Sequence, residues 1–254
     1  MNDALYIAAT GMKAQTTQLD AIANNVANAS TPGFKRASVR FGDLVSAGAD
    51  AVATSSEPPS TAAGVRVDAV QRSFVAGEMR KVDDRMSVAI QGNGFIELQL
   101  PDGSAAYARG AKLEINADRL LGTVDGLALR PQIHVPGDMR QIDISADGQV
   151  QGTDDAGRAV QLGRIDLVQF ANPGALQPAG DGLWKADSAS GDPVVSPPGE
   201  AGNGRILQGY QEASNVQLVD EMVQLMVAQR AYEMNVKVMQ AADEVASMTN
   251  NLRK

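Results

Sequence analysis

The N-terminal segment carries apolar side chains at the spacing of an α-helix that packs along a partner. One series, seven residues apart, consists of Leu5, Met12, Leu19 and Val26. A second series follows three residues behind and is mostly small, with Ala8, Gln15, Ile22 and Ala29. This heptad pattern is typical of a coiled coil, and small residues in it allow a partner helix to approach closely. We therefore predict one long helix at the N-terminus.

A polar stretch with a proline and a glycine ends this helix. The side chains of Asn24, Asn25 and Asn28 compete for backbone hydrogen bonds, and Pro32 disfavours the helical region for Thr31. Gly33 then allows the chain to turn. The expected turn motif comprises Asn25, Asn28, Pro32, Gly33 and Phe34. Taken alone, the pattern also fits an ordinary helix end.

A second long helix is predicted at the C-terminus. Ser214 or Asn215 is the expected N-cap. Apolar positions seven residues apart are Leu218, Leu225, Tyr232 and Met239, and a second series contains Met222, Gln229 and Val236. Because both ends of the chain carry such a series, we predict that the two terminal helices are partners.

Between residues 64 and 206 the apolar period changes to two. Short apolar runs recur, for example at Val88 and Ile90 or Ile142 and Ile144, separated by turn sequences such as Pro101-Asp102-Gly103 and Asp147-Gly148. Glycine and aspartate supply the positive φ angle or the local hydrogen bonds of hairpin turns. This pattern predicts an all-β domain of many short strands.

The fold class expected from these patterns is α+β, with an all-β domain inserted between two helical ends. We expect a helix and turn at 1–35, an extended segment at 36–70, the β domain at 71–206 and the second helix at 207–254. Residues 46–63 are almost wholly Ala, Ser, Thr, Gly and Pro, which is typical of a flexible linker.

Composition narrows the possible partners. The 254 residues carry a formal net charge of −8, which argues against nucleic acid or an anionic membrane as the main partner. There is no cysteine, so disulfides and thiolate sites are excluded. The sequence has no apolar run long enough to span a membrane and does not begin like a secretory signal. By composition alone the chain would be expected in the cytoplasm.

Residues that carry chemistry are few. The single histidine, His134, lies between Ile133 and Val135 in a strand pattern, so we interpret it as a strand residue. Gly92-Asn93-Gly94 lacks the third glycine and the following helix of a dinucleotide-binding motif. The acidic pairs lack the ligand spacing of a calcium loop. We expect no catalytic residue, no metal and no cofactor.

Two motifs resemble the axial proteins of the bacterial flagellum, the rod and hook family. Near the start these are Asn24-Asn25, Ala27-Asn28 and Thr31-Pro32-Gly33-Phe34, and near the end Ser214-Asn215-Val216 and residues 228–233. Residues 88–95 and 100–103 look like the central domain of the family. The opening residues, the length and the closing helix resemble members of the distal rod, with the proximal rod as the alternative.

This resemblance implies a structural subunit that polymerises into a stiff helical tube and transmits torque for motility. It places 46–63 in a segment that packs between subunits, which is the alternative to a flexible linker. The implied partners are further copies, other rod proteins, the hook protein, surrounding ring proteins and the export apparatus, without nucleic acid or membrane insertion. Export through the type III channel, without a cleaved signal, would place the chain in the basal body.

Under this interpretation the helix positions form an assembly interface. The expected interface residues are Leu5, Met12, Leu19, Ile22, Val26, Leu218, Met222, Leu225, Tyr232, Val236 and Met239. An alternative from another class is a secreted β-domain binding module with coiled-coil ends, which predicts a ligand pocket in the β domain.

Overall fold

The computed structural model describes residues 2–45 and 62–251, which form two compact units. The helical unit comprises Met1–Ala27, Ala37–Gln71 and Val216–Lys254, and the β unit comprises Asn28–Arg36 and Arg72–Asn215. Most of the segment expected to be a linker, residues 46–61, lies outside the described residues. The inserted β domain between two terminal helices confirms the predicted α+β fold.

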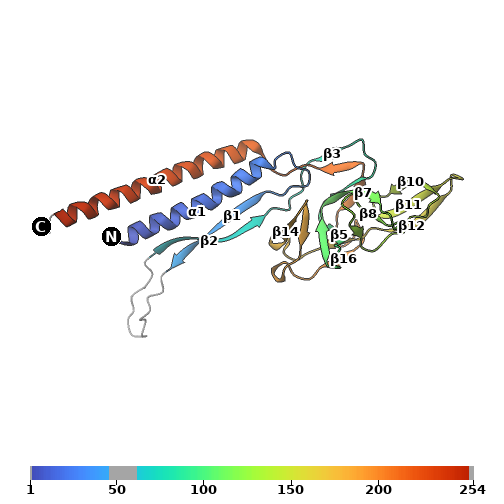
Figure 1. Ribbon diagram of the computed structural model, residues 1–254, viewed down its shortest axis with the longest axis horizontal. Helices are drawn as coiled ribbons and strands as arrows, with labels where there is room; N and C mark the ends of the chain where they lie inside the picture. The colour runs from blue at the N-terminus through green and yellow to red at the C-terminus, as the bar shows by residue number, and fades with distance from the viewer. Residues whose placement is uncertain (1, 46–61, 252–254) are drawn as a thin grey trace, which may run out of the picture. The chain divides into compact units, whose positions relative to one another are not determined.

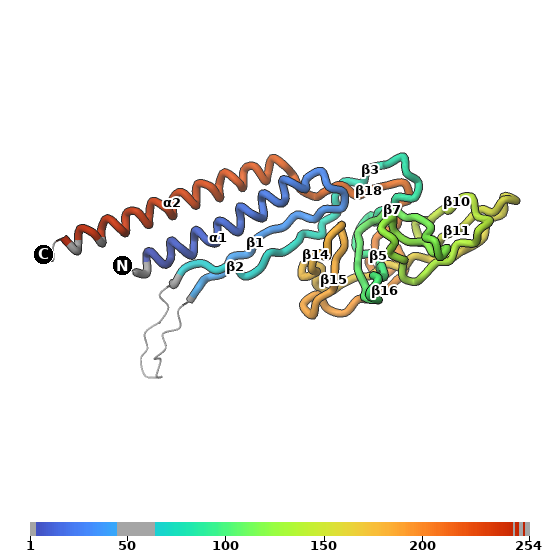
Figure 2. Tube along the Cα trace, viewed as in Figure 1, coloured from blue at the N-terminus to red at the C-terminus, as the bar shows by residue number. Residues whose placement is uncertain are grey.

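The helical unit pairs the two ends of the chain. Helix α1 (Asn2–Ala27) and helix α2 (Leu218–Asn251) run antiparallel, with the hairpin of β1 (Ala37–Val45) and β2 (Ala62–Arg72) beside α1 (Figure 1). The tube in Figure 2 shows the same order of α2, α1 and hairpin. The prediction that the terminal helices are partners is therefore confirmed.

Small residues allow the elements of this unit to approach closely. A Cβ atom at Gly11 would lie 3.0 Å from Nδ2 of Asn235 on α2. On the hairpin side, a Cβ at Gly64 would lie 2.3 Å from the Thr10 hydroxyl, and the φ angle of Gly64 is +127°. Glycine at these two positions lets α1 fit between α2 and the hairpin.

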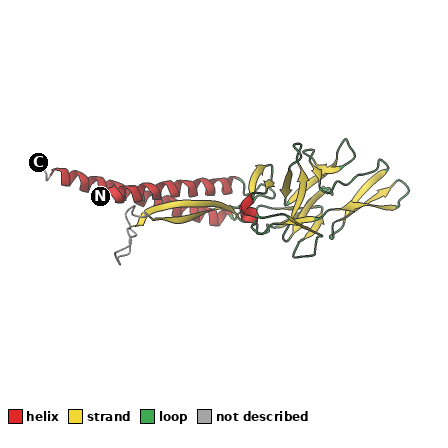
Figure 3. Ribbon diagram, turned by 90° about the horizontal axis from the view of Figure 1, so that it is seen from below, coloured by secondary structure: helices red, strands yellow, loops and turns green. Residues whose placement is uncertain are grey.

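The β unit contains sixteen short strands and two 3₁₀ turns (Figure 3). In chain order the strands are β3 (Met79–Lys81), β4 (Ser87–Gln91), β5 (Phe95–Gln99), β6 (Ala105–Ala108), β7 (Gly110–Ile115), β8 (Leu121–Thr123), β9 (Ala128–Leu129), β10 (Met139–Ile144), β11 (Gln149–Asp154), β12 (Ala159–Arg164), β13 (Leu167–Gln169), β14 (Gln177–Gly180), β15 (Leu183–Lys185), β16 (Val194–Ser196), β17 (Arg205–Gln208) and β18 (Tyr210–Glu212). The 3₁₀ turns are η1 (Pro173–Ala175) and η2 (Ser188–Ser190).

Antiparallel pairing organises these strands into three sheets. Most of them join one large sheet in the order β14-β15-β6-β5-β9-β8-β7-β4-β17, with β13 pairing β5 and β16. Strands β10, β11 and β12 form a meander, and β18 pairs with β3. The Gly92-Asn93-Gly94 segment, which its sequence suggests is a hairpin turn, joins β4 to β5, but these two strands pair with other strands and not with each other, so that suggestion is wrong.

Two apolar clusters fill the β unit. The larger one is lined by fully buried aliphatic side chains, including Ile90, Ile96, Leu98, Leu129 and Leu167. A second, aromatic cluster contains Phe95, Tyr107, Phe170 and Trp184, and its rings meet edge to face with centroids 4.8–5.8 Å apart. The alternating apolar runs of the sequence point into these clusters, so the unit has a core of its own.

The structure corrects two details of the sequence-based interpretation. Helix α2 begins at Leu218, so neither Ser214 nor Asn215 immediately precedes it. The Asn215 side chain instead binds backbone groups of the β unit. Residues 207–215 belong to that unit as well, because β17 and β18 pair with β4 and β3. Such short strands, three and four residues long, carry too little periodicity to be recognised from sequence.

Candidate functional site

The turn motif after α1 is held by its own backbone and by a distant segment. The Thr31 N–H donates to the Asn28 carbonyl at 3.0 Å, and the Phe34 N–H donates to the Thr31 carbonyl at 3.3 Å. Gly33 has a φ angle of +70°, and its N–H donates to the Glu212 carbonyl at 2.7 Å. The two passages of the chain at the edge of the β unit, residues 33–36 and 212–215, therefore lie side by side.

A buried ion cluster joins these two passages. Lys35, Glu212 and Arg109 are 0%, 2% and 3% exposed. Lys35 Nζ lies 2.7 Å from Glu212 Oε1, and Arg109 Nε lies 3.3 Å from Glu212 Oε2. Burial lowers the pKa of Lys35 below its ordinary value, although the Glu212 carboxylate opposes this shift. A carboxylate shared by two cations in a dry site strongly restrains the groups around it.

Backbone groups complete the coordination of the ion cluster. Arg109 donates to the carbonyls of Gly94 and Gly92 at 2.7 and 2.6 Å. Lys35 Nζ donates to the Val75 carbonyl at 3.0 Å, and the Gly77 N–H donates to Glu212 Oε1 at 2.8 Å. With these bonds the buried charges are satisfied, which a stable buried ion pair requires.

Asn215 adds a second tie between the same passages. Its side-chain oxygen accepts the Arg36 N–H at 2.7 Å, and its amide donates to the carbonyls of Ser73 and Val75 at 2.8 and 3.0 Å. Three segments that are distant in sequence are thereby held by one side chain. Asn215 is part of the Ser214-Asn215-Val216 motif, and these hydrogen bonds explain why an amide side chain suits this position.

Asn25 has an equivalent role inside the helical unit. It is 1% exposed, accepts the Ala37 N–H at 2.8 Å and donates to the Ala37 carbonyl at 2.8 Å. Its amide also donates to Glu221 Oε2 on α2 at 3.1 Å. One asparagine thus joins α1, the start of β1 and α2. The sequence places Asn25 in the turn motif, whereas the structure shows that it connects three elements.

The predicted interface residues fall into three exposure classes in the single chain. Ile22 is buried, with 3% exposed. The half-buried ones are Leu5, Met12, Leu19, Leu225, Val236 and Met239. The exposed ones are Val26, Leu218, Met222 and Tyr232. Sequence reasoning did not single out further exposed apolar residues of α2, namely Val219, Val223, Met226, Val227, Met234 and Val238.

These exposures show that α2 has more apolar surface than α1 covers. Met222 is 60% exposed and Val219 is 74% exposed, although both belong to a helix already paired with α1. An exposed apolar stripe of this extent marks an interaction surface in a soluble protein. The exposed face of α2 is therefore suited to binding another protein surface.

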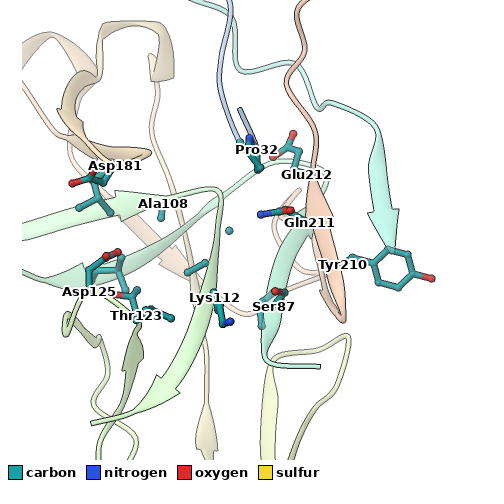
Figure 4. A pocket seen from close by; sticks show the side chains of 17 residues that line it. Pro32, Ser87, Ala108, Lys112, Thr123, Asp125, Asp181, Tyr210, Gln211 and Glu212 are labelled. Atoms are coloured by element: carbon teal, nitrogen blue, oxygen red, sulfur yellow. The ribbon is translucent and has the colours of Figure 1, made fainter. Parts of the chain in front are cut away.

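The β unit contains a cavity of about 200 Å³ beside the turn motif (Figure 4). Its lining includes Pro32, the hydroxyls of Ser87 and Thr123, and the carboxylates of Asp125 and Asp181. Figure 4 shows Thr123 and Asp125 together on one side, while the Tyr210 ring points away. The lining contains no histidine. The cavity therefore offers hydroxyl, carboxylate and ammonium groups for polar contacts, the ammonium from Lys112.

The single histidine lies elsewhere in the β unit. His134 is exposed and forms an isolated antiparallel bridge with Leu120, consistent with its interpretation as a strand residue. Within residues 2–45 and 62–251 no cluster of His, Cys, Asp or Glu side chains could hold a metal ion.

Three protein families match successive parts of the chain. The family described as "Flagella basal body rod protein" matches residues 5–35, which hold α1 and the turn motif. "Flagellar hook protein FlgE/F/G D1 domain" matches residues 89–152, and "Flagellar basal body rod FlgEFG protein C-terminal" matches residues 207–252. The buried ion cluster thus draws Lys35 and Glu212 from the first and last matched regions and Arg109 from the middle one.

Full-length relatives decide the family. The flagellar basal-body rod protein FlgG of Agrobacterium fabrum is 41% identical over 97% of this chain and 98% of its own length. The chain belongs to the FlgG family of flagellar basal-body rod proteins. In Caulobacter vibrioides, FlgG is 39% identical over 98% of this chain and 99% of its own length. FlgF of the same organism is 30% identical over 97% of this chain and 96% of its own length.

Membership of the FlgG family confirms the expectation from the terminal motifs. The chain is a structural subunit of the flagellar rod, and the difference between the FlgG and FlgF identities favours the distal rod over the proximal alternative. As a rod protein it belongs to the flagellar basal body. None of the helices that the structure describes is long and apolar enough to cross a membrane.

Proposed function

We propose that this rod subunit of the FlgG family polymerises into the stiff distal tube by burying the exposed face of α2 against neighbouring subunits. The observation that carries the proposal is the exposed apolar surface of α2, which includes Leu218, Met222, Val227 and Met234 at 50–62% exposed. Fully burying one such side chain stabilises by about 1.5–3 kcal/mol. Several together supply the free energy of a stable subunit contact.

The same surface explains why assembly and folding of the ends are coupled in this proposal. A unit of two helices and one hairpin with an uncovered apolar face is marginal in water, because ordering each residue costs about 1.5 kcal/mol. We expect the terminal helices to be largely unfolded in the free chain and to fold as neighbours cover them. Chains with unfolded ends are suited to passage through a narrow export channel.

The proposal includes the predicted interface residues and partners. Val26, Leu218, Met222 and Tyr232 meet neighbouring copies, while Leu5, Met12, Leu19, Ile22, Leu225, Val236 and Met239 line the helix pair. The other partners are the remaining rod proteins, the hook protein, the surrounding rings and the export apparatus, which delivers the chain without a cleaved signal. The role is mechanical, with no catalytic step.

Amide hydrogen exchange on the free chain and on isolated basal bodies tests this proposal. We expect α1 and α2 to exchange freely in the free chain and to become protected after assembly. The internal reference is β4 and β5, whose side chains are mostly buried in the β unit and which should be protected in both samples. Full protection of α2 in the dilute free chain would contradict coupled folding and favour the binding-module alternative.

A further inference from the structure

A groove in the helical unit is open between α1 and the β1–β2 hairpin. Its volume is about 320 Å³, and it is lined by residues of α1, β1 and β2. The floor is formed by Ala14 of α1, Leu44 of β1 and Val67 of β2. Lys13 stands on the α1 side and Arg66 on the β2 side, both exposed. The groove is therefore apolar at its floor and cationic at its rims.

Arg66 is partly neutralised within its own strand, because its Nε lies 2.7 Å from Asp68 Oδ1. Lys13 is then the main source of positive charge at the groove, in a chain whose formal net charge is −8. A matching occupant has an apolar ridge with an acidic side chain beside it, and it is narrow enough to lie along α1.

The C-terminal end of α2 has this chemistry. The register of the helix pair places Asn25 against Glu221 and Gly11 against Asn235, which carries Asn2 to the level of residue 244. The described part of α2 continues to Asn251, so its last two turns extend past the beginning of α1. Met248 lies on these last turns and is 63% exposed, and Glu244, level with the start of α1, and Ala241 lie at helical spacing on the same exposed face.

We propose that the groove between α1 and the hairpin binds the C-terminal end of α2 from a second copy of this chain. Met248 covers the apolar floor, and Glu244 lies beside Lys13. This inference rests on the proposed polymerisation and names the surface that each subunit offers to the next.

The geometry of such a contact explains why it would propagate. The groove and the end of α2 are different surfaces of one subunit, so the contact is heterologous. Each bound copy presents a new groove, and the order α2, α1, hairpin repeats from subunit to subunit. A heterologous contact that does not close into a ring produces a helical polymer.

Engineered cysteines test the contact without background, because the natural chain has no cysteine. Two variants combine Met248→Cys with Thr10→Cys or Thr17→Cys, at the two ends of the groove on α1. The matched control combines Met248→Cys with Thr16→Cys, an exposed residue of α1 outside the groove lining. Each is expressed in cells that lack their own copy, and isolated basal bodies are oxidised and separated on denaturing gels.

We expect a ladder of disulfide-linked oligomers from at least one groove pair and monomer from the control. A product that stops at the dimer would overturn the heterologous arrangement. If both groove variants assemble into rods but neither gives a ladder, the groove is not the binding site, although polymerisation itself stands. Absence of rods with the unmodified chain would instead contradict the proposed function itself.

If a cysteine variant does not assemble, reversing the charges of Lys13 and Glu244 tests the same contact. Lys13→Glu should reduce the number of rods per cell at least about tenfold, and adding Glu244→Lys should restore it, since the pair is reversed rather than lost. Lys13→Glu combined with Glu233→Lys, on an earlier exposed turn of α2, is the control. Failure of Glu244→Lys to rescue more than Glu233→Lys would overturn the contact.

Discussion

The two units of this chain satisfy their apolar residues in opposite ways. In the β unit the large aliphatic side chains are enclosed, with Ile90, Ile96 and Leu98 fully buried. In the helical unit, Val219, Met226 and Met234 of α2 are 53–74% exposed. The difference teaches that the β unit encloses an aliphatic core within one chain, whereas α2 leaves a long series of apolar side chains exposed. We propose that other copies of the chain cover the exposed face of α2.

The largest effect is expected from Glu212→Gln in the β unit. Loss of the carboxylate leaves Lys35 and Arg109 as two uncompensated cations in a dry site, and breaking such buried pairs costs about 3–5 kcal/mol. Urea unfolding of the free chain, followed by Trp184 fluorescence, measures the change. Glu78→Gln is the control, because the Glu78–Arg80 pair is exposed and contributes at most about 1 kcal/mol. Equal effects of the two variants would contradict the structural role of the ion cluster.

A matched pair of truncations tests the contrast between the units directly. Leu98→Ala should destabilise the free β unit by about 2–5 kcal/mol, because a fully buried side chain leaves a cavity. Met234→Ala should change the stability of the free chain by no more than about 0.5 kcal/mol, since this side chain is 60% exposed.

Met234→Ala should impair assembly even though it leaves the stability of the free chain nearly unchanged. Basal bodies counted by electron microscopy should decrease with Met234→Ala although its free chain is as stable as the natural one. Normal assembly of this variant would show that the exposed stripe of α2 is not an interface at that position.

A smaller effect is expected from Asn25→Ala in the helical unit. The change leaves the buried N–H and carbonyl of Ala37 without their partner, which costs about 1–3 kcal/mol. Because this unit is marginal alone, the loss should appear as faster hydrogen exchange of α1 in assembled rods. Asp20→Ala, on the exposed side of the same helix, should leave the exchange unchanged. Unaltered exchange with Asn25→Ala would show that Asn25 does not stabilise the contact between α1, β1 and α2.

The smallest effect concerns the acid response of the β10–β12 meander. The backbone N–H of Arg158 donates to Asp154, which lowers the pKa of that carboxyl. A lowered carboxyl pKa stabilises the fold at neutral pH, and this contribution disappears as the pH falls below about 4 through the lowered value. In Asp154→Asn the exchange protection of the meander should be weaker at neutral pH and less sensitive to acid. Asp155→Asn is the control, because this neighbour in the same turn is exposed and its carboxylate pairs with the exposed Arg140. A matching response from it would refute the assignment.

Local sequence rules predicted the elements whose signals are local. Glycine and aspartate mark the turn at Gly92-Asn93-Gly94 and the hairpin turn at Asp147-Gly148, because few other residues adopt the required backbone angles. The terminal helices followed from apolar spacing. Strands β3 and β18 were missed because each has three residues and pairs with a partner more than a hundred residues away.

The candidate site was predicted less completely, for a physical reason. Lys35 and Glu212 are 177 positions apart, and no local pattern shows that a lysine will be buried against a glutamate. The line of α2 that faces α1 also contains polar and small residues, such as Glu221, Ala228 and Asn235, which a search for apolar positions passes over. Exposed and buried heptad positions look alike in sequence, so the pattern identified the helices but not which face each copy leaves uncovered.

The side-by-side passages at residues 33–36 and 212–215 also determine how the chain carries a load. A pull or twist applied to one passage reaches the other through the Gly33–Glu212 bond, the ion cluster and Asn215 within a few residues. The two passages are therefore joined at several points within the β unit, and they separate only if several hydrogen bonds and an ion pair break together. In a rod subunit, these bonds limit how far the two passages can move apart under a mechanical load.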